Sequence, residues 1–160
     1  MFNQKENGLL QDLKSAEQLC IEKYGKYAAQ AQTEPLKQLF SSIQGQEQRH
    51  LQTLDQIIAS GGACCGQQQS GGQGGQQSSG GQGGQQLQGN YGSRDDAFRN
   101  DRFLCSDALA MEKHVSADYN ISIFEFKDPA VRSTLNHIQK EEQQHGQQIY
   151  DYMSANGMYN

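Results

Sequence analysis

Two histidines in this chain each follow a glutamate by three residues, in the segments Glu47-Gln-Arg-His50 and Glu142-Gln-Gln-His145. A further glutamate, Glu17 or Glu112, stands 30 residues before the glutamate of each pair, and the two sets are 95 residues apart. A glutamate and a histidine three residues apart share one face of a helix and can reach the same cation. Four carboxylates and two imidazoles match, in number and type, a dinuclear metal site inside a four-helix bundle.

The composition excludes several classes of protein. The 160 residues are about one domain's worth of sequence, and the formal net charge of −5 disfavours a nucleic-acid partner. No apolar run approaches the roughly 18 residues of a membrane-spanning helix, and residues 1–10 lack the apolar core of a signal peptide. We therefore expect a protein that is synthesised in the cytoplasm and has no membrane span.

Residues 61–100 carry almost no apolar side chains and contain an internal repeat, in which residues 70–77 recur as residues 79–86. Gly, Gln and Ser cannot bury enough apolar surface to offset chain entropy, which predicts a disordered, Gly/Gln-rich crossover. A self-associating low-complexity patch is the alternative, because glutamine-rich tracts can be adhesive. The crossover divides the single predicted domain, residues 1–160, into two halves, residues 6–60 and 101–159.

The two halves align without a gap at the offset of 95, so that Tyr24 falls on Tyr119. This match predicts an internal duplication of a helical hairpin. Thr33-Glu-Pro35 and Asp128-Pro129 are typical of the residues that open a helix, and they mark the turn of each hairpin. We expect four helices, over residues 6–32, 34–60, 101–127 and 129–156.

Steps of three and four residues place the apolar side chains of each predicted helix on one stripe. In the last helix the stripe is Val131, Leu135, Ile138, Glu142, His145, Ile149 and Tyr152. All six candidate ligands lie on these stripes, which face the bundle core. An unpaired ionised carboxylate in a core costs several kcal/mol, whereas two divalent cations balance the charge of four glutamates. The stripes therefore predict an all-α bundle with a metal site near its middle.

The two hairpins can bring these side chains together about a two-fold axis perpendicular to the bundle. Such an axis puts the start of the third helix at the opposite end of the bundle from the finish of the second. The connection must then run about 30 Å, the length of a 20-residue helix, and the crossover can span this distance. Two alternatives are open: the hairpins pair between chains, or the duplication preserves a hydrogen-bonded core network instead of a metal site.

The repeated pattern of a lone glutamate followed by Glu-x-x-His resembles the ligand set of ferritin-like di-iron proteins, including rubrerythrins and bacterioferritins. The resemblance implies a ferritin-like bundle that holds two iron ions, with manganese as the alternative metal. It implies that Glu47 and Glu142 bridge the ions and that each histidine binds one of them. The implied ligands are Glu17, Glu47, His50, Glu112, Glu142 and His145. Unlike rubrerythrins, the chain has Cys20 and Val115 where a further glutamate would stand, and it lacks a rubredoxin-like cysteine cluster.

The second half contains the segments Met111-Glu-Lys-His114 and Asp128-Pro-Ala-Val-Arg132 and closes with Gly157-Met-Tyr159. In these segments residues 101–159 resemble the coat F domain of bacterial spore-coat proteins, with Met158 in place of an aromatic residue in the closing motif. The resemblance implies a location in the spore coat. It also implies that the partners are other coat proteins or further copies of this chain.

Two functions are consistent with these resemblances. The first is a structural coat protein whose dinuclear metal centre is auxiliary. The second is an oxidoreductase, similar to rubrerythrin or manganese catalase, that reduces peroxide or dioxygen. Whether the chain is an enzyme stays open at this point.

Two tyrosines and a cysteine pair also have side chains that could take part in chemistry. Tyr24 and Tyr119 lie two turns from Glu17 and Glu112 on the same stripes, where we expect them to hydrogen-bond carboxylates around the site. Redox tyrosines are the alternative. Cys64-Cys65 stands in the crossover, where it either cross-links chains in an oxidising coat or is merely tolerated. Two further histidines are expected at the surface: His114 and His137.

Overall fold

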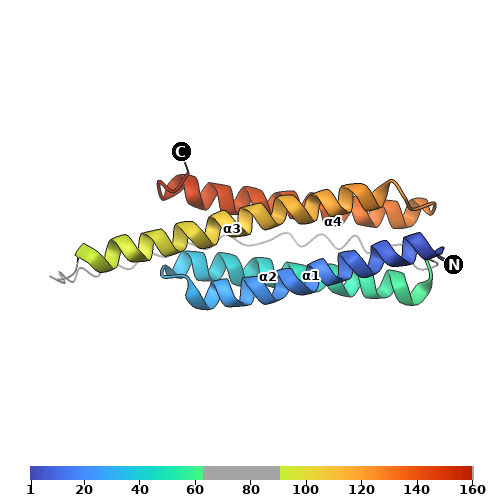
Figure 1. The fold of residues 1–160 in the computed structure, drawn as a ribbon, viewed down its shortest axis with the longest axis horizontal. Helices are drawn as coiled ribbons and strands as arrows, with labels where there is room; N and C mark the ends of the chain where they lie inside the picture. The colour runs from blue at the N-terminus through green and yellow to red at the C-terminus, as the bar shows by residue number, and fades with distance from the viewer. Residues whose placement is uncertain (63–90, 160) are drawn as a thin grey trace, which may run out of the picture.

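The computed structural model describes residues 1–62 and 91–159. These residues form four helices: α1 (Gln4–Gln30), α2 (Glu34–Ser60), α3 (Tyr91–Ile123) and α4 (Pro129–Ala155). Helix α1 packs against α2 and α3 against α4, and the two hairpins lie along one long axis (Figure 1). The predicted all-α architecture of two helical hairpins is confirmed. The expected disordered crossover lies outside the described residues over 63–90.

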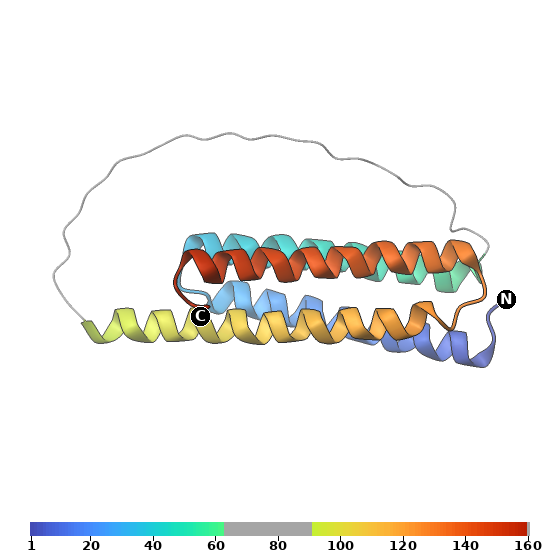
Figure 2. The ribbon, with the colours of Figure 1, turned by 90° about the horizontal axis from the view of Figure 1, so that it is seen from above.

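The helix directions agree with the expected two-fold relation between the hairpins. Figure 2 shows α2 and α3 running in the same direction, so that α3 starts at the end of the bundle opposite to the finish of α2. At one end the backbone N–H of Gln32 donates to Asp101 (2.8 Å), and at the other the N–H of Lys127 donates to Glu6 (3.0 Å). The two donors are 95 residues apart, and so are the two buried acceptors. The same contact therefore fixes both ends of the bundle and holds the middles of the helices level.

Capping residues define several of the helix ends. Asn3 and Glu6 form a capping box at the start of α1, and the Asp128 carboxylate accepts a hydrogen bond from the N–H of Ala130 (2.8 Å) at the start of α4. Gly61 ends α2 with φ +61°, a conformation that glycine adopts at little cost. Thr33 occupies the capping position of α2 as predicted, but its side chain makes no capping hydrogen bond there.

The start of α3 differs from the prediction. The helix begins at Tyr91, ten residues before the expected position 101, so residues 91–100 are helical and not part of a disordered crossover. The sequence from 94 to 100 contains no glycine, and Asp95 stands four residues before Arg99, a spacing that stabilises helices. Asn100 also donates a hydrogen bond to the carbonyl of Gln30 (3.1 Å). Figure 2 shows this first part of α3 projecting beyond the other helices.

The predicted stripes form the core with one exception. Every residue on the four stripes is buried except Tyr152, which is half-buried. Met153 takes the core position instead, with 2% of its surface exposed. Tyr152 lies at the rim because its hydroxyl reaches the hydroxyl of Thr33 (2.6 Å), a polar partner that the core does not offer.

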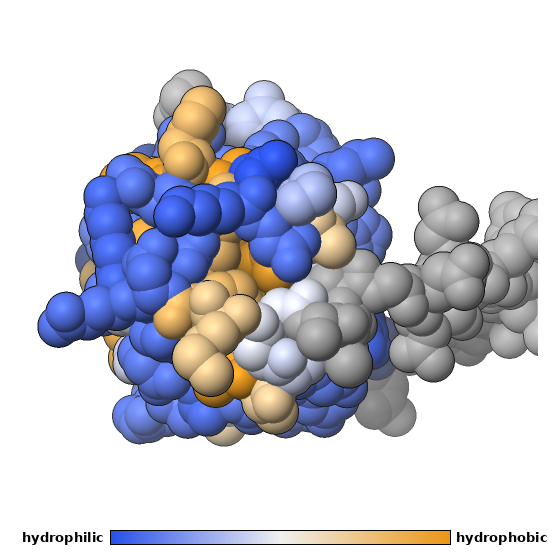
Figure 3. All heavy atoms as spheres, turned by 90° about the vertical axis from the view of Figure 1, so that its right-hand side faces the viewer, coloured by the Kyte–Doolittle hydropathy of each residue, from blue (hydrophilic) through white to orange (hydrophobic). Residues whose placement is uncertain are grey.

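Hydrophilic residues cover much of one end of the bundle (Figure 3). Figure 3 views the end that carries the N-terminus, where apolar atoms show between hydrophilic rims. Phe2 and Phe126 meet edge to face near this end, with ring centroids 5.8 Å apart. None of the helices in the described part of the chain has the length and apolar character that crossing a membrane requires.

Candidate metal centre

Each of the four helices contributes acidic or imidazole side chains to the middle of the bundle. Helix α1 supplies one glutamate and α3 another, while α2 and α4 each supply a glutamate and the histidine one turn later. Between 0% and 3% of each side chain is exposed. The set consists of Glu17, Glu47, His50, Glu112, Glu142 and His145.

These six residues form two overlapping groups. The first contains Glu17, Glu47, His50 and Glu142, and the second contains Glu47, Glu112, Glu142 and His145. Within each group, one ligand atom from every residue lies within 4.8 Å of the others. Glu47 and Glu142 belong to both groups, because they come from the two central positions that the two-fold relation exchanges. The structure thus places all six sequence-predicted residues in one cluster.

The histidines point one ring nitrogen at the cluster. The Nδ1 atom of His50 lies 2.9 Å from Glu142 Oε1 and 3.2 Å from Glu47 Oε2. The Nδ1 atom of His145 lies 3.0 Å from Glu47 Oε1 and 3.6 Å from Glu112 Oε2. Each imidazole therefore contacts glutamates from both hairpins, and the two rings stack with their centroids 5.6 Å apart.

The second ring nitrogen of each histidine meets a residue that the sequence analysis did not single out. Nε2 of His50 lies 3.1 Å from Glu141 Oε2, and Nε2 of His145 lies 2.8 Å from Gln46 Oε1. Glu141 and Gln46 immediately precede the central glutamates and are themselves 95 residues apart. The sequence could have identified Glu141 and Gln46 by their position next to a core stripe, since residues flanking a stripe reach the neighbouring helix.

The two core tyrosines donate hydrogen bonds across the hairpins. The Tyr24 hydroxyl donates to Glu112 Oε1, and the Tyr119 hydroxyl donates to Glu17 Oε1. Burial, together with these carboxylates, raises the pKa of both phenols well above their ordinary value, so both remain protonated donors. Hydrogen bonding to the acidic cluster is the role that these contacts support.

The four carboxyl groups fall into two kinds, with raised or with lowered pKa values, depending on how strongly the histidines oppose the effect of burial. Burial raises the pKa of Glu17 to about 9 and that of Glu112 to about 8, which keeps both acids neutral at pH 7. Burial acts in the same direction on Glu47, but close contacts with the imidazoles of His145 and His50 lower its pKa to about 2. The pKa of Glu142 is also lowered, because its contacts with the two histidines outweigh burial.

Both histidines are cationic in this environment. Burial alone would lower the pKa of His145, but the surrounding Glu112, Glu142 and Glu47 raise it to about 11. The pKa of His50 rises as well, chiefly through its contact with Glu141. Two imidazolium groups thus face two ionised and two neutral carboxyl groups, and the cluster has no net charge without metal.

The cluster leaves buried polar atoms without hydrogen bonds, which is the test of whether cations fit. Across the side chains described in residues 1–62 and 94–159, six buried nitrogen or oxygen atoms make no hydrogen bond, although several of them lie at ion-pair distance from one another, and every one belongs to this cluster. Buried polar atoms are nearly always hydrogen-bonded, so six exceptions at one place require an explanation. Oxygen and imidazole nitrogen donors facing one another at this spacing fit divalent cations.

Comparison with known families bears on the second hairpin. Residues 100–160 match the Coat F domain. The second hairpin is therefore similar to the Coat F domain. Curated proteins and solved structures give no match to the chain. The matched segment supplies Glu112, Glu142 and His145 to the cluster, and the first hairpin, which lies outside the match, supplies the other three residues.

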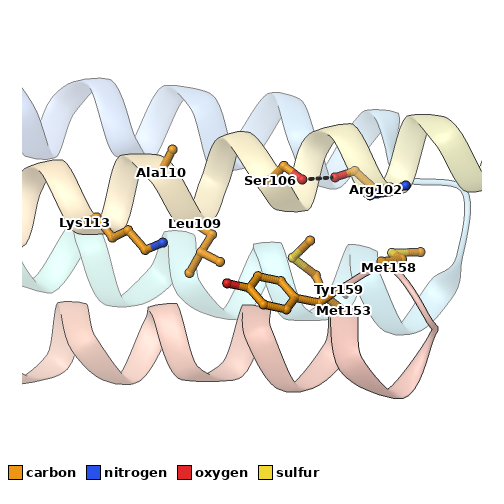
Figure 4. A pocket seen from close by; sticks show the side chains of 8 residues that line it. All are labelled: Arg102, Ser106, Leu109, Ala110, Lys113, Met153, Met158 and Tyr159. Carbon is orange, nitrogen blue, oxygen red and sulfur yellow. Dashed lines mark hydrogen bonds between the residues drawn. The ribbon is translucent and has the colours of Figure 1, made fainter.

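A surface hollow on the second hairpin lies apart from this cluster. It has a volume of about 320 Å³ and is lined by residues of α3, α4 and the C-terminal segment, including Arg102, Lys113 and Tyr159. Figure 4 shows these side chains around the hollow, with the Ser106 hydroxyl bonded to its own helix. None of the six clustered residues lines it. The candidate metal centre is therefore enclosed by the helices and does not open into this hollow.

Proposed function

We propose that this protein is a structural component of the spore coat whose bundle binds two divalent metal ions. The observation that carries the metal site is the pair of overlapping Glu/His groups, in which six buried atoms have no hydrogen-bond partner. The Coat F domain supports the location in the coat. The proposed partners are other coat proteins or further copies of this chain.

The residues have distinct roles in this proposal. Glu47 and Glu142 belong to both groups and would be shared between the two ions. Glu17 and His50 complete one position, and Glu112 and His145 complete the other. Since the ligands come from all four helices, bound metal links the two hairpins directly. Such a link suits a protein that must persist in a durable shell.

The donor set fits iron, which we propose as the bound metal, with manganese as the alternative. Each group offers three carboxylates and one imidazole. Carboxylate ligands suit hard cations such as manganese, imidazole suits iron, and sulfur ligands, which favour zinc and copper, do not occur in either group. Two divalent cations also match the charge of four ionised glutamates.

An oxidoreductase is the second candidate, favoured by the small number of protein ligands. Each group provides four residues, two of which are shared, whereas octahedral metal ions take six ligands. Positions therefore remain for a small exogenous molecule. Bound iron or manganese would supply the electrons for reducing peroxide or dioxygen, and the buried Tyr24 and Tyr119 would keep their hydrogen bonds to the glutamates.

Metal binding is tested by titrating the purified protein with Fe(II) without oxygen and with Mn(II). We expect two equivalents to bind. Glu47→Ala removes a bridging ligand and should abolish tight binding, and Glu47→Gln, which keeps the side-chain volume, should do the same. Glu22→Ala is the matched control, because that carboxylate is 62% exposed. Full metal occupancy in both Glu47 variants would refute the site.

Activity and location separate the two candidate functions. Sustained turnover of peroxide by the iron- or manganese-loaded protein, with ascorbate added as the electron donor and with the turnover lost in Glu47→Gln, would favour the oxidoreductase. Tight binding of two ions without turnover favours the structural role. Recovery of a tagged chain in the coat fraction of a spore-forming host tests the location, and its absence from that fraction would contradict the proposal.

A further inference from the structure

The two halves of the cluster differ in the residue that lies behind the histidine. Glu141 stands behind His50, with its Oε2 3.1 Å from Nε2 of the ring, whereas Gln46 stands behind His145, with its Oε1 2.8 Å from Nε2. The duplication relates Gln46 to Glu141 by the offset of 95 that also relates the two histidines. One imidazole is therefore backed by a carboxylate and the other by a neutral amide.

The contacts with Glu141 and Gln46 hold the two imidazole rings in equivalent orientations. An acceptor oxygen at Nε2 places the N–H on that nitrogen and leaves the Nδ1 lone pair directed at the cluster, as a metal ligand requires. The orientation of the two histidines therefore does not distinguish the halves. What differs is charge, since a carboxylate is a full anion and an amide oxygen is not.

This difference changes the donor strength of the two rings. A charge-assisted hydrogen bond is roughly twice as strong as a neutral one, and a carboxylate behind an imidazole makes the other nitrogen a more basic ligand. Glu141 also adds a negative charge one ring away from the cation beside His50. Both effects favour metal at the His50 position over the His145 position.

We propose that the two metal positions are unequal, and that Glu141 and Gln46 are the positioning residues that set the order of filling. The group formed by Glu17, Glu47, His50 and Glu142 takes the first divalent cation, and the group containing His145 takes the second. This inference rests on the proposed metal site. At limiting metal, the protein then holds a single ion on the His50 side.

The expected size of the effect follows from the exposure of Glu141. Residues that hydrogen-bond to a metal ligand typically change metal affinity by about 10- to 100-fold when mutated. The Glu141 side chain is 31% exposed and also lies 3.5 Å from the surface residue His137, so solvent and a neighbouring imidazole reduce its influence. We therefore expect a difference near the lower limit, about tenfold.

Stepwise binding constants alone cannot test the inference, because the shared glutamates weaken the second binding step in any case. The test is crystals of the full chain grown with one equivalent of Mn(II), in which anomalous diffraction measures the occupancy of each position separately. In the wild type we expect the stronger peak beside His50. Equal peaks, or a stronger peak beside His145, would overturn the inference.

Two variants make the test specific for the charge behind the ring. Glu141→Gln keeps an acceptor and removes the charge, and should bring the two peaks close to equality. The double variant Gln46→Glu/Glu141→Gln exchanges the two residues and should move the stronger peak to His145. A peak that stays beside His50 in the exchanged protein would show that another feature sets the order, and would overturn the inference.

The same crystals separate this inference from the proposed function. With excess Mn(II), wild type and both variants should show two fully occupied positions, because all six ligands remain. Two equal peaks at one equivalent would overturn the unequal filling and leave the metal site standing. No peak at either position with excess Mn(II) would overturn the metal site, and the inference with it.

Discussion

At the residue scale, the six clustered side chains bind protons as well as being candidate metal ligands. Without metal, the charges of the cluster cancel because protons occupy both histidines and two of the glutamates. The raised pKa values of Glu17 (about 9), Glu112 (about 8) and His145 (about 11) reflect this arrangement, and that of His50 is raised too. Metal ligands must lose these protons before they bind. Metal and protons therefore compete for the same atoms.

Metal binding should release protons. At pH 7 the four groups with raised pKa values are protonated in the metal-free protein, so binding two divalent ions should release about four protons. The apparent affinity should rise with pH until these groups deprotonate without metal. Calorimetric titration in buffers of different ionisation enthalpy measures the number released. Binding without proton release would show that other residues hold the metal.

The tyrosine contacts should contribute to stability. Tyr24→Phe leaves Glu112 without its hydroxyl donor in a site closed to water, and we expect a loss of about 1–3 kcal/mol in the free energy of unfolding. Chemical denaturation of the metal-free protein measures this loss. Tyr150→Phe is the matched control, because that ring is 39% exposed. A loss in the control as large as that in Tyr24→Phe would contradict the assignment.

At the element scale, the hairpins are joined at both ends by the same contact. Asp101 on α3 accepts from the turn that ends α1, and Glu6 on α1 accepts from the turn that follows α3. Both acceptors are buried although they carry carboxylates. The contacts satisfy the backbone N–H groups of Gln32 and Lys127, which lie in the turns and have no partner within a helix. They also fix how far one hairpin can slide along the other.

Removing one of these contacts should loosen the bundle end. Asp101→Ala leaves the N–H of Gln32 without its partner, and we expect a loss of about 1–2 kcal/mol in the free energy of unfolding. Hydrogen exchange of that amide should become faster than in the wild type. Asp12→Ala, at an exposed position of α1, is the control. Unchanged exchange at Gln32 would show that the contact does not hold the turn.

At the scale of the whole molecule, metal should stabilise the entire bundle because its ligands come from four helices. A ligand present at 100 times its dissociation constant adds about 2.7 kcal/mol, which corresponds to a rise in Tm on the order of 5–10 °C. Thermal unfolding with and without metal measures the shift. Glu47→Gln should show no such rise, and a rise of equal size in that variant would contradict metal binding at this site.

The metal-free protein should lose stability as the pH rises. Glu17 has a pKa raised from 4.5 to about 9, and that of His145 is raised from 6.5 to about 11. Groups with a raised pKa in the folded state stabilise it fully below the unfolded value, and this contribution disappears as pH rises through the folded value. We therefore expect Tm to fall between pH 6.5 and 9 without metal. A constant Tm over this window would contradict the protonation states described.

Much of the fold and of the candidate site could be predicted from residue types and their spacing alone. The six clustered residues, the two hairpins and nearly every core position follow from helix periodicity and from the duplication at an offset of 95. These features are local, because a side chain on the apolar face of a helix is buried in whatever bundle that helix joins. The need for cations or protons at the four glutamates is equally independent of the tertiary arrangement, since buried carboxylates must be neutralised in any bundle.

Only the tertiary structure decided which residues meet across the hairpins. The pairs Tyr24–Glu112, His50–Glu141 and His145–Gln46 depend on the rotation and height of one hairpin against the other. The burial of Met153 in place of the predicted Tyr152 also depends on this packing, because a partner hydroxyl on the other hairpin holds the tyrosine at the rim. A periodic pattern shows which face a helix buries, but not which side chain of the neighbouring helix lies opposite. The packing of two rigid hairpins determines that.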